Sequence, residues 1–194
     1  MTTDQLMPLE TASRYARQIV EWLGPYCERV EVAGSVRRGR LMCGDVDLVV
    51  IPKREVSCDL LGSVMTDRNL LHEFLLDYVA DPSHRASWRG GENGQGCNLL
   101  VQLKGCLLDV FCTTAECWGS MLICRTGSRE HNVWLANRAK RMGGQWSPYS
   151  GVIADGILQP APSEEAVYSA LGLPWIPPAE REWDLLVEGF GGVT

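Results

Sequence analysis

The chain has 194 residues, 45% of them hydrophobic, which is enough for one or two small domains with a buried core. Its apolar runs are shorter than the roughly 18 residues that span a membrane, and its polar N-terminus lacks the pattern of a signal or transit peptide, so we expect a cytoplasmic monomer with no membrane partner. Eight cysteines occur without a Cys-x-x-Cys pair, which favours reduced thiols over zinc ligands or disulfides.

Residues 1–114 alternate between helical and strand patterns. Apolar residues recur at helical spacing over residues 10–23, and Gly24 and Pro25 end this helix. The elements expected next are a strand at 29–33, a helical turn at 36–40, a strand at 45–51, a helix at 69–79, strands at 86–89 and 98–103 around a glycine-rich connection at 90–96, a turn at 104–105 and a strand at 107–111. Strands and helices without a long βαβ series predict an α+β fold, with a mixed sheet and helices in this part.

Residues 115–194 predict a smaller unit of helices and a hairpin. Ser128 and Ser163 are suited to N-cap two of the helices. The elements expected here are a helix at 116–124, a break at 126–128, a helix at 129–142, a hairpin of 149–153 and 156–158 around a turn at 154–156, and a helix from 164 to 171. We therefore expect two domains, 1–114 and 115–194.

Two carboxylates follow a glycine-serine loop at Gly34 and Ser35. Asp45 and Asp47 are two residues apart on an expected strand, so they point to the same face, roughly 7 Å apart at their Cα atoms. Asp109 interrupts an apolar strand, where a lone carboxylate is unfavourable without a partner. An isolated Asp-x-Asp also fits a solvated strand end. The coincidence of the loop, the pair and the third acid instead predicts a site for divalent cations and a triphosphate.

The net charge of -6 is unevenly distributed. Residues 145–194 hold seven acids and one base, whereas residues 1–144 hold 17 of each. Between residues 125 and 141, five bases stand against one acid. This predicts a local basic face that binds nucleic acid through Arg138, Lys140 and Arg141, the alternative being a solvated helix face.

These motifs resemble those of the family X DNA polymerases, the group that includes DNA polymerase beta. The family pattern of Gly-Ser, two variable or basic positions, Arg-Gly, a short turn and Gly-Asp-x-Asp is matched without a gap by GSVRRGRLMCGDVD at residues 34–47. Residues 126–132 resemble the family's Thr-Gly-Ser motif with its following Asn, and residues 163–178 resemble its C-terminal tail. The resemblance runs from about residue 10 to about residue 183. It implies a nucleotidyltransferase palm at 1–114 and a nucleotide-closing subdomain at 115–194.

The resemblance implies a template-directed DNA polymerase that adds nucleotides to a primer 3′-hydroxyl, in short-gap repair synthesis on gapped or primer-template DNA. Asp45, Asp47 and Asp109 would be catalytic and would bind two Mg²⁺ ions, for which Mn²⁺ can substitute. The nucleoside triphosphate would be bound by Gly34, Ser35, Arg38, Gly44, Gly127, Ser128, Arg129 and Asn132. Within this set, the resemblance assigns the β- and γ-phosphates to Ser35, Arg38 and Gly44. Gly127 and Ser128 would form a turn beneath the sugar that often contains a cis peptide in the family. Arg129 would lie against the base, and Asn132 would read its minor-groove edge. Arg37 and Arg40 are expected to face solvent or nucleic acid.

The sequence departs from the family in three respects. It begins at the palm, so we expect neither helix-hairpin-helix DNA anchors nor a lyase domain. We likewise expect no phosphoesterase domain of the kind that many bacterial members carry at their C-terminus. The aromatic pair that usually precedes Thr-Gly-Ser is replaced by Cys124 and Arg125. We therefore expect weak DNA binding through few phosphates and weaker rejection of ribonucleotides.

Two other functions stay open at this point. One is a terminal nucleotidyltransferase that acts on RNA, single strands or a small molecule. The other is a binding module without catalytic activity. Three carboxylates argue against an inactive module, and the basic helix with Asn132 favours a polynucleotide over a small molecule.

Overall fold

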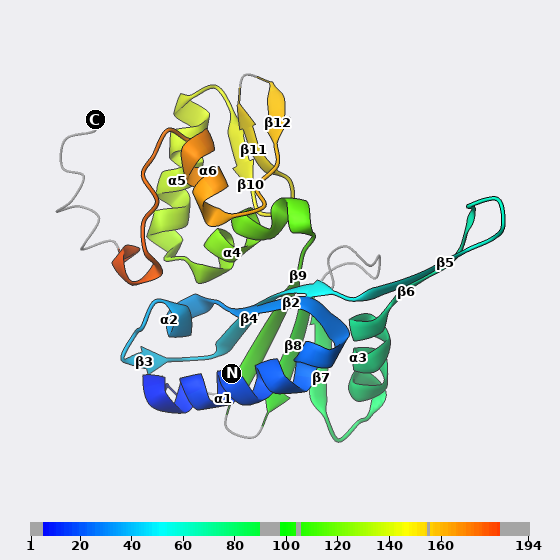
Figure 1. Ribbon diagram of the computed structural model, residues 1–194. Helices are drawn as coiled ribbons and strands as arrows, with labels where there is room; N and C mark the ends of the chain where they lie inside the picture. Colours follow the sequence, from blue (N-terminus) through cyan, green and yellow to red (C-terminus); the bar gives the residue numbers. More distant parts are fainter. Residues whose placement is uncertain (1–5, 90–97, 104–105, 155, 183–194) are drawn as a thin grey trace.

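A computed structural model of the protein describes residues 6–89, 98–103, 106–154 and 156–182. A palm built on a sheet carries a smaller subdomain over one of its faces (Figure 1). The α+β prediction is confirmed. The predicted connection at 90–96, the turn at 104–105 and the central residue of the turn at 154–156 lie outside the described residues.

A mixed sheet forms the centre of the palm. Among the described residues it has five strands, in the order β2-β4-β9-β8-β7. β4 and β9 run parallel at its centre, whereas every other neighbouring pair is antiparallel. The strands are β2 (Cys27–Val32), β4 (Val46–Pro52), β7 (Arg85–Arg89), β8 (Asn98–Leu103) and β9 (Cys106–Cys112).

One face of this sheet is covered by α1 (Leu9–Leu23), which continues into the 3₁₀ turn η1 (Gly24–Tyr26), and by α3 (Leu70–Ala80) (Figure 1). Side chains on a strand alternate between faces, so every second residue of β4 and β9 joins this core. Those residues are Val46, Leu48, Val50, Leu108, Val110 and Cys112, all at most 2% exposed. The residues between them, including Asp47 and Asp109, therefore point to the opposite face.

The opposite face is covered by α4 (Trp118–Thr126), which follows the 3₁₀ turn η2 (Ala115–Cys117). A single apolar cluster joins the sheet and this helix, and its buried members are Ala33, Val49, Phe111, Trp118, Met121 and Leu122. The predicted boundary after residue 114 falls between β9 and η2, across which this cluster packs. Because the cluster belongs to both sides, the division into 1–114 and 115–194 stays a prediction.

The smaller subdomain packs α4, α5 (Arg129–Arg141) and α6 (Glu164–Ala170) around a core of its own that includes Ile123, Leu135 and Tyr168. An antiparallel sheet of β10 (Gln145–Ser147), β11 (Gly151–Ala154) and β12 (Ile157–Gln159) and the 3₁₀ turn η3 (Pro178–Glu180) complete the described part. Both predicted N-caps are confirmed. The hydroxyl of Ser128 accepts a hydrogen bond from the His131 amide, and that of Ser163 accepts one from the Ala166 amide.

Several elements were not predicted. The strands β1 (Met7–Pro8) and β3 (Met42–Cys43) pair with each other, and the helical turn α2 (Gly34–Arg37) begins two residues earlier than expected. A hairpin of β5 (Arg54–Cys58) and β6 (Val64–Asn69) extends away from the palm, with nearly all of its residues exposed (Figure 1). Within the described part of the chain, no helix is long and apolar enough to cross a membrane.

Candidate active site

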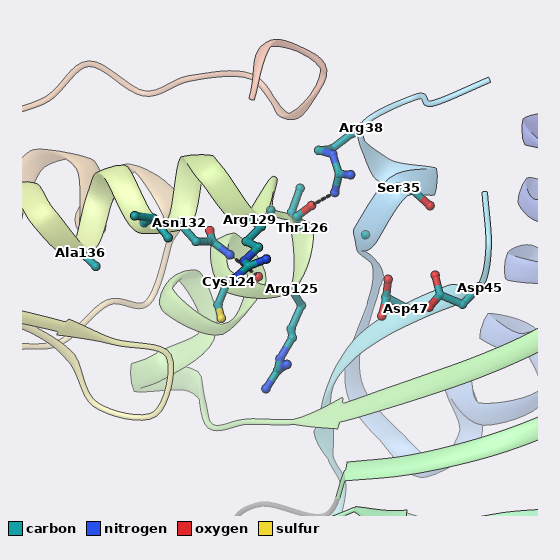
Figure 2. Close-up of a pocket in the computed structure, with 13 residues that line it drawn as sticks. Ser35, Arg38, Asp45, Asp47, Cys124, Arg125, Thr126, Arg129, Asn132 and Ala136 are labelled. Atoms are coloured by element: carbon teal, nitrogen blue, oxygen red, sulfur yellow. Dashed lines mark hydrogen bonds between the residues drawn. The ribbon is translucent and has the colours of Figure 1, made fainter. Parts of the chain in front are cut away.

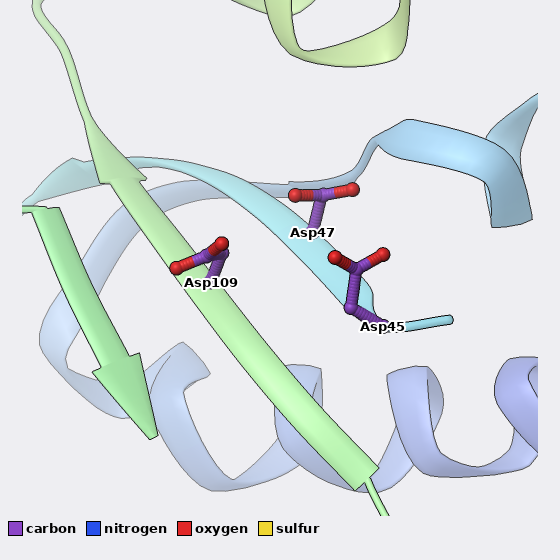
Figure 3. Close-up of side chains that lie close together, drawn as sticks. All are labelled: Asp45, Asp47 and Asp109. Carbon is purple, nitrogen blue, oxygen red and sulfur yellow. The ribbon is translucent and has the colours of Figure 1, made fainter. Parts of the chain in front are cut away.

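Three aspartates meet on the sheet face that looks toward the smaller subdomain. Asp47 on β4 and Asp109 on β9 stand opposite each other in the parallel pair, and Asp45 immediately precedes β4. One carboxylate oxygen from each acid lies within 4.8 Å of the others (Figure 3). A cluster of hard, anionic oxygen ligands is the type of site that Mg²⁺ or Mn²⁺ prefers, so the three residues fit the predicted metal site.

The electrostatics of the cluster favour bound cations. Burial, together with the negative charges of Asp45 and Asp109, raises the pKa of Asp47 to about 7, even though Arg125 and Arg38 act to lower it. Three carboxylates this close repel one another when all are ionised. Cations placed among them would remove this repulsion and return Asp47 to its ionised form.

The glycine-serine loop, whose residues Gly34 and Ser35 begin α2, fits closely against the cluster. Gly34 has a φ of +60°, and a Cβ atom added there would lie 1.9 Å from Oδ2 of Asp47. Glycine is therefore required at this position both by its left-handed conformation and by the approach of the carboxylate. The hydroxyl of the next residue, Ser35, is buried and has no hydrogen-bond partner among the described residues. An orphaned donor in this loop fits the predicted role in binding phosphate.

A cavity of about 580 Å³ lies between the aspartates and the smaller subdomain (Figure 2). Its palm side includes Asp45 and Asp47, and its other side comes from α4, α5 and the turn between them. Of the residues predicted to bind nucleotide, those that line it are Gly34, Ser35, Arg38, Gly127, Arg129 and Asn132. Gly44 and Ser128 do not line it, and their predicted contacts stay predictions. The volume is in the range of small-molecule sites.

The turn between α4 and α5 contributes main-chain groups to the cavity. The peptide bond between Gly127 and Ser128 is cis, as the family resemblance implied. The Arg38 guanidinium donates to the main-chain oxygen of Thr126 (Figure 2). Asn132 donates from its amide nitrogen to the carbonyl of Cys124 at 2.7 Å, while its side-chain oxygen is buried without a partner in the described part of the chain.

Arg125 is held beside the carboxylates. Its guanidinium stacks on the ring of Phe111 at 3.8 Å, and its Nη2 atom donates to the hydroxyl of Tyr149 at 3.3 Å. It lines the cavity and lowers the pKa of Asp47. Sequence reasoning recognised Arg125 as a replacement for an aromatic residue but not its contact with Phe111, because these two residues are distant in sequence.

The expectation that Arg37 faces solvent or nucleic acid was wrong. Its Nη1 and Nη2 atoms donate to the two carboxylate oxygens of Glu164 at 2.6 and 3.1 Å, and Nη1 also donates to the hydroxyl of Thr126 at 3.0 Å. Glu164 in turn accepts two hydrogen bonds from Arg181, whose side chain is 0% exposed. These residues join α2 of the palm to α6 and to the segment after η3. Nothing in the periodicity of the sequence marks Glu164 as buried, since an acid in the first turn of a helix is ordinarily solvated.

The predicted basic face lies on the last turn of α5. Lys140 and Arg141 are exposed, whereas Arg138 is half-buried and donates from Nε to the carbonyl of Leu171 at 2.9 Å. Arg138 is therefore partly engaged at the end of α6. Contact of the three residues with nucleic acid stays a prediction.

Comparison with known proteins agrees with this geometry. The DNA polymerase beta thumb family matches residues 121–182. The chain is 30% identical to rat (Rattus norvegicus) DNA polymerase lambda in an alignment of length 168, which covers 77% of this chain and 28% of that protein. It is 27% identical to the DNA polymerase/3′-5′ exonuclease PolX of Bacillus subtilis (strain 168) over 186 residues, which are 94% of this chain and 30% of that protein. The chain thus spans less than a third of the length of these relatives.

This chain combines a palm sheet that carries clustered carboxylates with a thumb of the DNA polymerase beta type. These two features place it in the class of the polymerase-like nucleotidyltransferases. The thumb match covers the smaller subdomain, and the two relatives extend the similarity over the palm. The chain belongs to the family X DNA polymerases.

Proposed function

We propose that this chain is a template-directed DNA polymerase that adds nucleotides to a primer 3′-hydroxyl, and that it acts in the filling of short gaps. The observation that carries the proposal is the cluster of Asp45, Asp47 and Asp109 beside a cavity of nucleotide size. The names of the two relatives and the thumb match support DNA as the substrate.

In this proposal the three aspartates hold two Mg²⁺ ions. The ions, when bound, supply Lewis-acid stabilisation of the charge that develops on the oxygens of the transferred phosphoryl group. Asp45 and Asp47 hold the metal–triphosphate, and Asp109 orients the primer hydroxyl and accepts its proton. The rise in the pKa of Asp47 supports this assignment, because a buried carboxylate among like charges needs cations to stay ionised.

The loop and the thumb turn bind the nucleotide. Ser35 donates its hydroxyl and Arg38 its guanidinium to the β- and γ-phosphates, while Gly34 allows the backbone to approach them closely. Gly127 and Ser128 support the sugar, Arg129 stacks against the base, and Asn132 reads the base edge. The orphaned hydroxyl of Ser35 and the unpartnered oxygen of Asn132 support this assignment, since each has hydrogen-bonding capacity that no described residue uses.

DNA binding is assigned to the exposed end of α5. Lys140 and Arg141 contact phosphates there, and Arg138 contributes the donors that Leu171 does not use. Few phosphate contacts make the affinity low and dependent on salt.

An extension assay tests the proposal. The protein is incubated with Mg²⁺, each deoxynucleoside triphosphate, and one of three labelled substrates: a one-nucleotide gap, a single strand, or an RNA. We expect insertion of the templated nucleotide at the gap. Untemplated addition to the single strand or the RNA would instead identify a terminal transferase, and the lack of any addition would identify a binding module.

Replacement of Asp109 by Asn tests the site. We expect extension to fall roughly a thousandfold, the middle of the range for a lost general base, while the protein stays folded and retains triphosphate binding. Asp77→Asn is the matched control, because Asp77 is an exposed acid on α3 remote from the cavity residues. Extension by the Asp109→Asn variant within tenfold of wild type would contradict the assignment.

A further inference from the structure

Arg38 is held from two sides by groups of the thumb. Its Nε atom donates to Oε1 of Glu182 at 2.7 Å, and its Nη1 atom donates to the main-chain oxygen of Thr126. The second oxygen of Glu182 lies 3.5 Å from Nη1 of Arg40. The side chain of Arg38 is 12% exposed and that of Glu182 is 29% exposed, so this contact is largely shielded from water.

The contact uses the donors that a phosphate needs. An arginine binds an oxyanion bidentately through two parallel N–H groups. These come either from the side edge, formed by Nε and Nη2, or from the end edge, formed by Nη1 and Nη2. Glu182 occupies Nε, and Thr126 occupies Nη1, so each of these two edges has one donor already taken. A phosphate can therefore be bound bidentately by Arg38 only if one of the two thumb groups is released.

Glu182 is the group that can be released at low cost. The oxygen of Thr126 belongs to the main chain and cannot rotate away as a side chain can. Arg38 also packs closely against the neighbouring Gly127, since a Cβ atom added to this glycine would lie 3.1 Å from Nη1 of Arg38. Glu182, in contrast, holds Arg38 through a flexible side chain. The residue before it is fixed, because Arg181 is fully buried on Glu164 and its carbonyl accepts a hydrogen bond from the Ser128 amide at 3.3 Å. Rotation of one side chain thus frees Arg38 without disturbing that anchor.

We propose that Glu182 competes with the phosphates of the incoming nucleotide for Arg38, so that triphosphate binding releases its carboxylate from Arg38 and, with it, from Arg40. This inference rests on the proposed function, because it takes Arg38 to be a phosphate ligand. The carboxylate and the phosphate share their chemistry, since both are anions that accept from the same N–H groups. The competition sets the affinity for nucleotide below the value that the cavity alone would give.

The test is a calorimetric titration that measures the affinity of the full chain for dCTP in the presence of MgCl₂ and in the absence of DNA. Glu182→Gln removes the charge at constant size, and Glu182→Ala removes the side chain. We expect both variants to bind dCTP about fivefold more tightly than wild type, the upper range for a partly exposed ion pair. Tripolyphosphate as the probe should show the same gain, because the competition concerns phosphates and not the base.

Glu180→Gln is the matched control. Glu180 lies two residues before Glu182, at the end of η3, and its side chain is exposed, so the variant removes the same charge outside the contact with Arg38. We expect its affinity to stay within twofold of wild type. Equal gains in Glu180→Gln and Glu182→Gln would reduce the effect to overall charge and overturn the inference, as would unchanged or weaker binding in both Glu182 variants. If the wild type binds dCTP and the variants differ in no way from it, only this inference fails. If no variant and no wild-type protein binds dCTP at millimolar concentration, the proposed function fails with it.

Discussion

Replacement of Glu164 by Gln should destabilise the protein by about 3 kcal/mol. Glu164 is the acceptor for five hydrogen bonds among the described residues, two each from Arg37 and Arg181 and one from the indole of Trp175 at 3.2 Å. Glutamine keeps one acceptor oxygen and turns an NH₂ group toward these donors. The guanidinium of Arg181, which is 0% exposed, then lacks a counter-charge. Removing one partner of a buried ion pair costs about 3–5 kcal/mol.

The pKa of Glu164 gives a second estimate of the same size. Burial alone would raise this pKa, but hydrogen bonds from Arg181 and Arg37 outweigh burial and lower it from 4.5 to about 2. At about 1.4 kcal/mol per unit, this difference amounts to ~3 kcal/mol. Because the folded pKa lies below the unfolded one, the stabilisation is present above pH 4.5 and is lost as the pH falls toward 2. The difference in stability between wild type and Glu164→Gln should therefore shrink across that window.

The measurement is urea unfolding followed by tryptophan fluorescence at pH 7. With a slope on the order of 2 kcal/mol per molar urea, the midpoint should fall by about 1.5 M. Glu165→Gln is the control, because Glu165 is an exposed acid in the same first turn of α6 and should change stability by less than about 0.5 kcal/mol. A loss below about 1 kcal/mol in Glu164→Gln, or an equal loss in Glu165→Gln, would refute the assigned role of the buried pair.

Three further outcomes are expected. Asp47, with a pKa of about 7, must lose its proton to bind a cation, so the affinity for Mn²⁺ should rise by up to about tenfold per pH unit toward pH 7 and then level off. Electron paramagnetic resonance titrations measure this affinity, and a constant value from pH 5.5 to 7 would contradict the reasoning. Cys124→Tyr combined with Arg125→Phe should raise the ratio of kcat/KM for a deoxynucleotide to kcat/KM for its ribonucleotide. If the wild-type ratio is already above roughly ten-thousandfold and the double variant leaves it unchanged, sugar selection lies elsewhere. Lys140→Glu combined with Arg141→Glu should weaken DNA binding and reduce the salt slope by about 2 while leaving the choice of base unchanged, and an altered base choice would move these residues into the active site.

Sequence reasoning succeeded where a short-range rule decides the structure. The alternation of side chains on a strand predicted that Asp45 and Asp47 share a face, and an apolar strand around Asp109 predicted that this acid has a partner. Local hydrogen-bonding preferences likewise predicted the caps at Ser128 and Ser163, which the structure confirms. Each of these inferences needs only a few neighbouring residues.

Contacts between distant parts of the chain could not be predicted in this way. Arg37 stands in a basic motif that is typical of a surface, yet it binds Glu164, which lies 127 residues later. The hairpin of β5 and β6 has no buried apolar face that would reveal its strands, because nearly all of its residues are exposed and several pairs opposite each other are charged or polar, such as Glu55 with Arg68 and Ser57 with Thr66. In both cases the partner, and not the local pattern, determines the structure.

The apolar cluster that joins β4 and β9 to α4 bears on how this protein could be recombined with its relatives. A graft that exchanges everything after residue 114 would replace Trp118, Met121 and Leu122 and so set Val49 and Phe111, beside the clustered aspartates, against a foreign helix. Conversely, a graft that begins after Gly127 would keep Trp118 and Met121 in their native places and would divide the polypeptide in the turn that lines the cavity. In a chimaera, α4 and the palm should therefore come from the same parent protein, and the exchangeable module begins at α5.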